Sequence, residues 1–318
     1  KMLYADIKSD IEIIENELEQ ALNSSSHLLN DASIHLLQAG GKRIRPVFTL
    51  LSAKFGDYNI ERMKNIAVPL ELIHMGSLVH DDVIDNSDMR RGQETVKAQW
   101  NNRVAMYTGN FIFARALEYV TSIENPRAHQ ILAKTMVELV NGEVIQIEDK
   151  FRLDQNMKDY FRRIKRKTAL LIESSCELGA VVSGADEKTV RHLKRYGYFV
   201  GMSFQIVDDI LDFTATDKQL GKPAGSDLMQ GNVTLPILLM KDNPLLAPYL
   251  AKVSTTGLTE QERQNMLALV RNSDAIKEAT KISNLYLKKA LKEVEALPNH
   301  PMKKKLRDIA LFMGKRKS

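Results

Sequence analysis

The sequence of 318 residues is poor in cysteine, in net charge and in long hydrophobic runs. A single cysteine, Cys176, excludes an internal disulfide and fits a reducing compartment. The net charge of +5 is too small to indicate a partner made of nucleic acid. No apolar run approaches the roughly 20 residues that a membrane-spanning helix needs, and no secretory signal is visible. We therefore expect a cytoplasmic protein.

Patterns typical of β-strands are nearly absent as well. Apolar residues recur at spacings of three and four along almost the whole chain, which is the repeat of an amphipathic helix. No change in composition divides the chain, so we expect one all-α domain over residues 1–318. With the positions of the prolines, the pattern predicts helices at about residues 2–22, 26–39, 43–55, 61–86, 97–121, 126–150, 155–166, 168–184, 187–215, 233–240, 259–270, 273–295 and 299–314, with long loops at 87–95 and 214–231.

One acidic motif, DDxxD, occurs twice, beginning at Asp81 and at Asp208. In a helix, residues four apart share a face, so Asp85 lies beside Asp81 and Asp212 beside Asp208. Each motif ends an apolar segment, where crowded carboxylates repel one another and resist desolvation. Magnesium relieves both penalties, and it bridges carboxylate and diphosphate oxygens. One such motif is more often a solvated helix end, but two copies after apolar segments favour a metal site.

Basic residues accompany both motifs. Arg90 and Arg91 follow the first motif directly, and Lys222 lies in a glycine-containing loop after the second. Arginine binds phosphate with a planar fork of donors. Upstream, the sequence GGKRIRP over residues 40–46 places three cations after two glycines, near an expected helix start that suits an anion. Together these residues indicate a site for diphosphate.

These segments resemble the trans-isoprenyl diphosphate synthases. The resemblance rests on GGKRIRP at 40–46, DDVIDNSDMRRG at 81–92, FQIVDDILD at 204–212 and GKPAGSDL at 221–228. The motifs are most similar to component II, the catalytic subunit, of two-component heptaprenyl or hexaprenyl diphosphate synthases. The family implies a helical bundle around a central apolar cavity, Mg²⁺ as cofactor, and condensation of isopentenyl diphosphate onto an allylic diphosphate such as farnesyl diphosphate.

The resemblance also assigns roles to the matching residues. Magnesium would be bound by Asp81 and Asp85 with Asp82 in support, and from the other side by Asp208 with Asp209 and Asp212 nearby. The allylic diphosphate would be held by Arg90, Lys167 and Lys222, and the isopentenyl diphosphate by Lys42, Arg45, His74 and Arg91. Thr168 and Gln205 would face the developing allylic cation. The implied catalytic set is Asp81, Asp85, Arg90, Lys167, Thr168, Gln205 and Asp208.

Two positions depart from the short-chain members of the family. Gln146 stands where an aspartate faces the metal, and Asn232 stands where a second lysine is common. We assign neither as a ligand. Because the carboxylates of both motifs are intact, we expect the chain to be active.

Product length is expected to depend on an apolar channel behind the first motif. A helix rises about 1.5 Å per residue, so a residue eight positions back lies roughly 12 Å deeper. Ser77 and Gly76 are small and would leave the channel open near its mouth, and Ile73 would form a deeper floor. By family resemblance we expect a hepta- or hexaprenyl product for the side chain of a quinone such as menaquinone.

The resemblance implies a small non-catalytic second subunit in a heterodimer, or otherwise a homodimer. Three alternatives stay open: a single-component geranylgeranyl or other long-chain synthase, a terpene cyclase, and a non-catalytic helical regulatory subunit. The intact second motif argues against a cyclase, and the intact aspartates and cations argue against a regulatory subunit. A poorly soluble product leaves room for transient contact with a membrane surface. The basic residues after Gly314 are expected to fray, with closure over the diphosphate site as the alternative.

Overall fold

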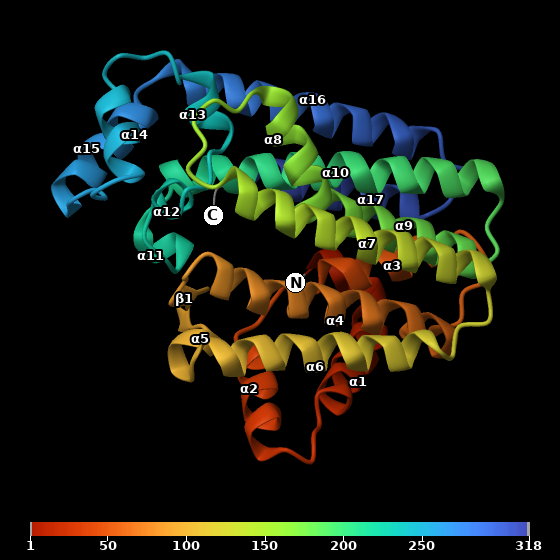
Figure 1. Cartoon of the computed structure of the whole chain (residues 1–318). Helices are drawn as coiled ribbons and strands as arrows, with labels where there is room; N and C mark the ends of the chain where they lie inside the picture. The colour runs from red at the N-terminus through yellow and green to blue at the C-terminus, as the bar shows by residue number, and fades with distance from the viewer. Residues whose placement is uncertain (1, 317–318) are drawn as a thin grey trace.

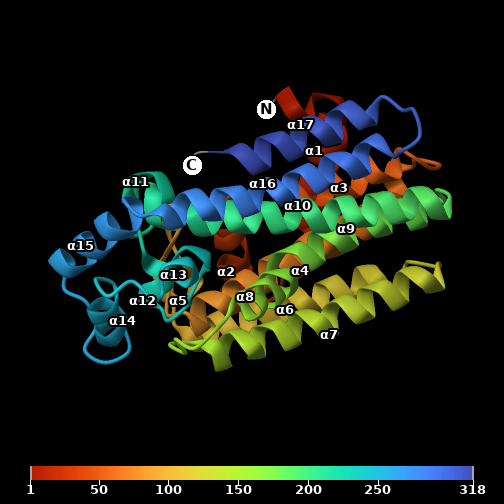
Figure 2. The ribbon, with the colours of Figure 1, turned by 90° about the horizontal axis from the view of Figure 1, so that it is seen from above.

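The computed structural model describes residues 2–316. Most of this part of the chain is helical, and the long helices run roughly side by side (Figures 1 and 2). The helices are η1 (Met2–Ile7), α1 (Lys8–Ala21), α2 (His27–Gln38), α3 (Ile44–Ala53), α4 (Ile60–Ile84), α5 (Val96–Gln99), α6 (Asn102–Val120), α7 (Pro126–Asp149), α8 (Met157–Ile164), η2 (Lys165–Ala169), α9 (Leu170–Val182), α10 (Glu187–Thr214), α11 (Asp217–Leu220), α12 (Ser226–Met229), α13 (Leu235–Leu239), α14 (Ala247–Val253), α15 (Glu260–Arg271), α16 (Asp274–Glu295) and α17 (Met302–Lys315). The predicted all-α fold is confirmed.

The two predicted long loops contain short elements that the sequence pattern did not predict. Strand β1 (Met89–Arg90) pairs antiparallel with β2 (Gln93–Glu94) inside residues 87–95. Helices α11 and α12 lie inside residues 214–231, and α14 was missed as well. Elements this short are too brief to produce a periodic pattern of apolar residues.

Helix starts follow the local sequence. Asn125 caps α7 by accepting a hydrogen bond from the backbone N–H of Arg127 at 2.9 Å, and Pro126 occupies the first turn, where its missing N–H costs nothing. Asp186 caps α10 in the same way, accepting from the N–H of Thr189 at 2.8 Å. These caps fix where the two long helices enter the bundle.

Helix α10 joins two clusters of buried hydrophobic side chains. Its first half contributes Leu193 and Tyr196 to one cluster, and its second half contributes Ile206 and Phe213 to the other. It packs along α9 and α16, while α4 packs along α3 and α6. The C-terminal ends of α4 and α10 both lie at the left of Figure 1, beside β1, α11 and α12. The fold therefore brings the two acidic motifs to the same end of the bundle.

No helix in residues 2–316 is long and apolar enough to cross a membrane.

Candidate active site

The first motif divides its carboxylates between the protein interior and the site. Asp82 is only 2% exposed and receives three hydrogen bonds from the guanidinium of Arg90, the shortest 2.7 Å from Nη2. Asp81 instead lines a narrow cavity of about 20 Å³, together with Ser77 and Lys167. The hairpin formed by β1 and β2 explains the position of Arg90. The chain reverses directly after Arg90 through Gly92, whose φ is +75°.

The last carboxylate of this motif has a partner that the sequence did not predict. The ammonium of Lys150, at the end of α7, lies 2.7 Å from Asp85 Oδ1 and donates to the carbonyl oxygen of Ile84 at 2.9 Å. Both charged side chains are largely buried. Lys150 therefore holds the end of α4, and with it the carboxylate of Asp85.

The second motif is divided in the same way. Asp209 is buried and accepts hydrogen bonds from the hydroxyl of Tyr160 and from Gln205 Nε2, the latter at 2.8 Å. Asp212 is buried, accepts from the backbone N–H of Asp227 at 3.3 Å, and lies 3.7 Å from the ammonium of Lys222. The side chain of Asp208, by contrast, is 43% exposed.

The carboxylates of Asp81 and Asp208 thus stay accessible to a ligand, and that of Asp85 lies against Lys150 at the end of α4. The other three hold neighbouring side chains in place: Asp82 holds Arg90, Asp209 holds Gln205, and Asp212 lies against Lys222.

The two loops that follow the motifs touch through their backbones. The N–H of Gly92 donates to the carbonyl oxygen of Gly221 at 3.1 Å. A β-carbon at Gly221 would lie 2.4 Å from the nitrogen of Gly92, so only glycine fits there. This contact fixes the distance between the loop that carries Arg90 and the loop that carries Lys222.

Burial makes the acidic cluster costly to ionise. Burial raises the pKa of Asp81 to about 6, against the opposing effect of Lys167. Burial and the nearby Asp227 raise the pKa of Asp212 to about 8, and the same two causes raise the pKa of Asp209 to about 6. Such shifts mean that a bound cation would stabilise the ionised carboxylates.

A cluster of basic side chains, Lys42, Arg45, Arg91 and Arg316, is joined to the acidic residues by the pair of Arg316 with Asp208. Burial lowers the pKa of Arg45 to about 10, and burial followed by the charge of Arg45 lowers the pKa of His74 well below its usual value. Burial followed by the charge of Arg316 also lowers the pKa of Lys42. The guanidinium of Arg91 donates to the carbonyl oxygen of Gly40 at 2.6 Å, which joins the hairpin to the glycine pair. An anion would relieve the repulsion among these cations.

The remaining cation of the GGKRIRP segment, Arg43, contacts another helix of the bundle. Arg43 has a left-handed φ of 52° at the start of α3, and its guanidinium pairs with Glu15 of α1. It also donates to the carbonyl oxygen of Gly40 at 3.5 Å, so its fork is occupied by the protein, whereas Lys42 and Arg45 are the two cations that the sequence assigned to substrate.

Lys167 and Thr168 lie in η2, a single π-helical turn between α8 and α9. Such turns insert an extra residue into a helix and are frequent at functional sites. Thr168 is buried, and its hydroxyl donates to Gln205 Oε1. The turn falls where the predicted helices 155–166 and 168–184 were separated.

The three residues predicted to control product length lie in line along α4. Ser77 lines the narrow cavity, and Ile73 is buried. Between them, Gly76 packs against Phe113 of α6, whose ring lies 3.1 Å from where a β-carbon at position 76 would be. Phe113 was not predicted, because nothing in the sequence pairs α6 with this turn of α4.

Arg316, the last residue that the structure describes, does not fray as expected but packs against the second motif. Its guanidinium pairs with the carboxylate of Asp208, donates to the carbonyl oxygen of Phe204 at 3.3 Å and lies 3.9 Å from the centre of the Phe204 ring. Lys317 and Ser318 lie outside the described residues.

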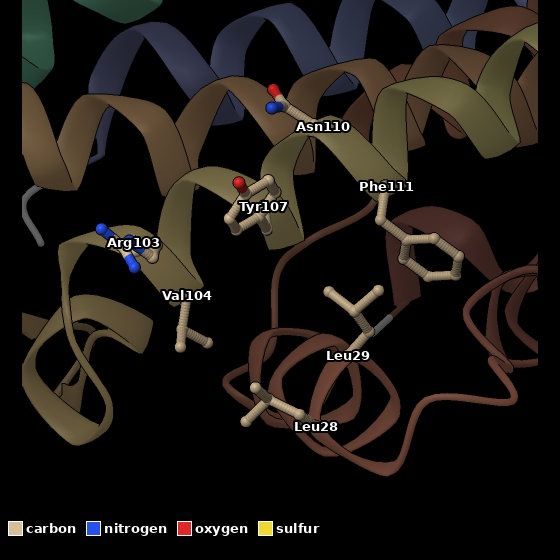
Figure 3. Close-up of a pocket in the computed structure, with 7 residues that line it drawn as sticks. All are labelled: Leu28, Leu29, Arg103, Val104, Tyr107, Asn110 and Phe111. Atoms are coloured by element: carbon tan, nitrogen blue, oxygen red, sulfur yellow. The ribbon is translucent and has the colours of Figure 1, made fainter.

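A second, larger pocket lies away from the motifs, between α2 and α6 (Figure 3). Its volume is about 630 Å³, and its lining is mostly apolar, with Leu28 and Leu29 on α2 and Val104, Tyr107 and Phe111 on α6. It contains none of the predicted site residues.

The accessible carboxylates fit a hard divalent cation. Within residues 2–316, no three Asp, Glu, His or Cys side chains come close enough to enclose a metal by themselves. A cation bound here would therefore complete its coordination with water and with oxygens of a ligand, as Mg²⁺ does on diphosphates.

A helical bundle that brings two acidic motifs and a cluster of cations to one end defines an enzyme that acts on diphosphates. The chain belongs to the polyprenyl synthetase family, which matches residues 26–265. It is a trans-prenyltransferase, as the sequence predicted.

Relatives match over nearly the whole chain. Heptaprenyl diphosphate synthase component 2 of Geobacillus stearothermophilus is 54% identical over 317 residues, covering 99% of this chain and 98% of the relative. A solved heptaprenyl diphosphate synthase from Staphylococcus aureus is 44% identical, with a TM-score of 0.91 over 98% of this chain and 99% of that one. A polyprenyl synthase from Caulobacter crescentus, solved with calcium and isoprenyl diphosphate, is 29% identical, with a TM-score of 0.95 over 99% and 97%.

Proposed function

We propose that this protein is the catalytic component of a two-component heptaprenyl diphosphate synthase. It would extend an allylic diphosphate, such as farnesyl diphosphate, with isopentenyl diphosphate for a quinone side chain. The observation that carries the proposal is the arrangement of Asp81, Asp85 and Asp208 beside a cation cluster at one end of the bundle. The names of the relatives favour heptaprenyl over hexaprenyl as the product.

The allylic diphosphate is held by Arg90, Lys167 and Lys222. Their charges stabilise the negative charge that develops when the carbon–oxygen bond ionises. Asp82 keeps the fork of Arg90 in place, and Asp212 restrains Lys222, so little reorganisation is needed during the reaction. Asp81, Asp85 and Asp208 would hold Mg²⁺, which would supply further positive charge to the leaving diphosphate.

Isopentenyl diphosphate is held by Lys42, Arg45, Arg91 and His74. Its double bond attacks the allylic cation, which forms the new carbon–carbon bond, and a proton is then lost to the released diphosphate. Thr168 and Gln205 face the cation while it exists. The growing chain enters a channel along Ser77, Gly76 and Ile73, and Phe113 occupies the space beside Gly76.

A partner subunit is supported by the surface of α7. Four exposed aliphatic side chains, Val137, Val140, Val144 and Ile147, recur at spacings of three and four and so form one stripe. About half the surface of each is exposed, and such a stripe is typical of an interface. Because two relatives are named component 2, we assign this stripe to a small non-catalytic second subunit. A homodimer is the competing outcome.

Two further properties are part of the proposal. The chain is one domain, which is supported by the contribution of α10 to both hydrophobic clusters. The protein works in the cytoplasm, which is supported by its single, buried thiol at Cys176.

The test uses the purified chain with Mg²⁺, farnesyl diphosphate and labelled isopentenyl diphosphate, with Asp81→Ala and Asp208→Ala as controls. Heptaprenyl diphosphate from the chain alone, lost in both controls, would support the enzyme and overturn the two-component form. No product, together with magnesium-dependent binding of a bisphosphonate, would support the need for a partner. Neither product nor binding would overturn the proposed function.

A further inference from the structure

A buried chain of hydrogen bonds leads from α8 to the reaction site. The fully buried hydroxyl of Tyr160 donates to Asp209 Oδ2. Asp209 Oδ1 accepts from Gln205 Nε2 at 2.8 Å, and Gln205 Oε1 accepts from the hydroxyl of Thr168. None of the roles proposed above uses Tyr160.

The chemistry of these groups fixes the direction of the chain. An ionised carboxylate only accepts hydrogen bonds, so Asp209 draws the NH₂ end of the Gln205 amide toward itself. The carbonyl end of Gln205 then faces Thr168 and accepts its hydroxyl hydrogen. A threonine hydroxyl has one hydrogen and two lone pairs, so the lone pairs of Thr168 are left to face the site beside Lys167.

Tyr160 makes this direction stable. Its ring is fully buried and its hydroxyl has one hydrogen, which it donates to Asp209 Oδ2, so this bond fixes the orientation of the carboxylate. Without the bond, the carboxylate of Asp209 could rotate about its Cβ–Cγ bond and release the NH₂ group of Gln205. The Gln205 amide could then flip, and its NH₂ group would donate to Thr168 and reverse the polarity.

We propose that Tyr160 is a positioning residue for the allylic cation, which acts through Asp209 and Gln205 to direct the lone pairs of Thr168 at the developing positive charge. The proposal rests on the proposed function, because it requires an allylic cation at this site. Lone pairs aimed in advance at a growing charge stabilise the transition state more than the ground state.

The test compares Tyr160→Phe with Tyr196→Phe. Both variants remove one buried hydroxyl. The hydroxyl of Tyr196, however, donates to the carbonyl oxygen of Leu306 at 2.6 Å and takes no part in the hydrogen bonds that lead to Thr168. For each we would measure binding of two allylic diphosphate analogues in the presence of Mg²⁺. One carries a protonated amine in place of the cationic carbon, and the other is the neutral thiolodiphosphate.

Tyr160→Phe should weaken binding of the ammonium analogue about tenfold, the size expected for one buried hydrogen bond to a charged group. Binding of the neutral analogue and the KM values should change less than about twofold, while kcat falls with the affinity for the ammonium analogue. Tyr196→Phe should leave both affinities unchanged. In a Thr168→Val background, Tyr160→Phe should add no further loss.

Equal effects on both analogues, or no effect on either, would overturn the role of Tyr160. If Tyr160→Phe does not fold, Gln205→Leu interrupts the chain one link nearer to Thr168 and must give the same selective loss. Failure of the wild-type chain to bind even the neutral analogue would overturn the proposed function itself, which separates the two conclusions.

Discussion

The ammonium of Lys150 lies 2.7 Å from the carboxylate of Asp85, across the gap between the ends of α7 and α4. The same ammonium also donates to the carbonyl oxygen of Ile84, one of the carbonyl groups at the end of α4 that have no partner within the helix. A residue proposed to bind a metal therefore already has a cation of the protein at its side.

Removing the ammonium of Lys150 should change the affinity of the substrate-free protein for Mg²⁺. Lys150→Met is expected to raise the affinity of the chain for Mg²⁺ about fivefold, on the order of 1 kcal/mol, because one positive charge no longer opposes another. It should also lower the melting temperature of the metal-free protein. Calorimetric titration measures the affinity. Lys134→Met, an exposed lysine on the same helix, is the control and should change neither value.

Arg316 pairs with Asp208 as Lys150 pairs with Asp85, so a cation of the protein again lies beside a proposed metal ligand. Arg316→Gln should strengthen Mg²⁺ binding at the second motif a few-fold, since the guanidinium no longer competes for the carboxylate. Arg307→Gln, on the exposed side of α17, is the matched control. A loss of turnover with no change in Mg²⁺ affinity would instead mean that Arg316 acts on substrate after the metal is bound.

Asp81 and Asp82 are adjacent but are expected to have different mutant phenotypes. Asp82→Asn should raise the KM for the allylic diphosphate about tenfold, because Arg90 loses its charged partner, while Mg²⁺ affinity changes little. Asp81→Asn should weaken Mg²⁺ binding most. Steady-state kinetics combined with metal titration of both variants distinguishes the effects. Identical losses of Mg²⁺ affinity would contradict the division of roles.

Product length should respond to the contact between Gly76 and Phe113. Gly76→Phe is expected to shorten the product, because a side chain at this position meets the Phe113 ring and closes the space behind it. Adding Phe113→Ala should restore part of the length by returning that volume. Chromatography of the products is the measurement, and an unchanged distribution in both variants would contradict the channel assignment.

Stability of the metal-free protein should fall as the solution becomes more alkaline. Burial and Asp227 raise the pKa of Asp212 to about 8, far above its value in an unfolded chain. The folded state therefore binds this proton more tightly, and stability is lost as the pH rises from about 4 to about 8. Asp212→Asn should flatten the dependence of the melting temperature on pH by a few degrees. Parallel curves for the two proteins would refute this origin.

The sequence predicted the parts of the structure that are encoded locally. Helical periodicity predicted the all-α class, and the two DDxxD motifs predicted acidic clusters at the ends of two buried helices. Asp208 and Asp212 were expected to share a face, but Asp212 is buried against Lys222 while Asp208 is exposed beside Arg316. The sequence did not predict the contacts that Lys150, Tyr160 and Phe113 make with residues of the site. Each acts on a residue from a distant segment, such as Lys150 on Ile84, 66 positions away, and Tyr160 on Asp209, 49 positions away. No local pattern specifies such pairs, because they arise from how helices pack.

The backbone contact between Gly92 and Gly221 limits which parts of the site substitutions can change. Side-chain replacements adjust each half of the site separately, but the gap between the halves is set where two main chains meet with no side chain between them. We therefore expect the proposed diphosphate site to keep the same width whatever the length of the product in the proposed channel. If α4 and α6 line the channel as proposed, substitutions along these helices should change product length while the geometry of the reacting end stays constant.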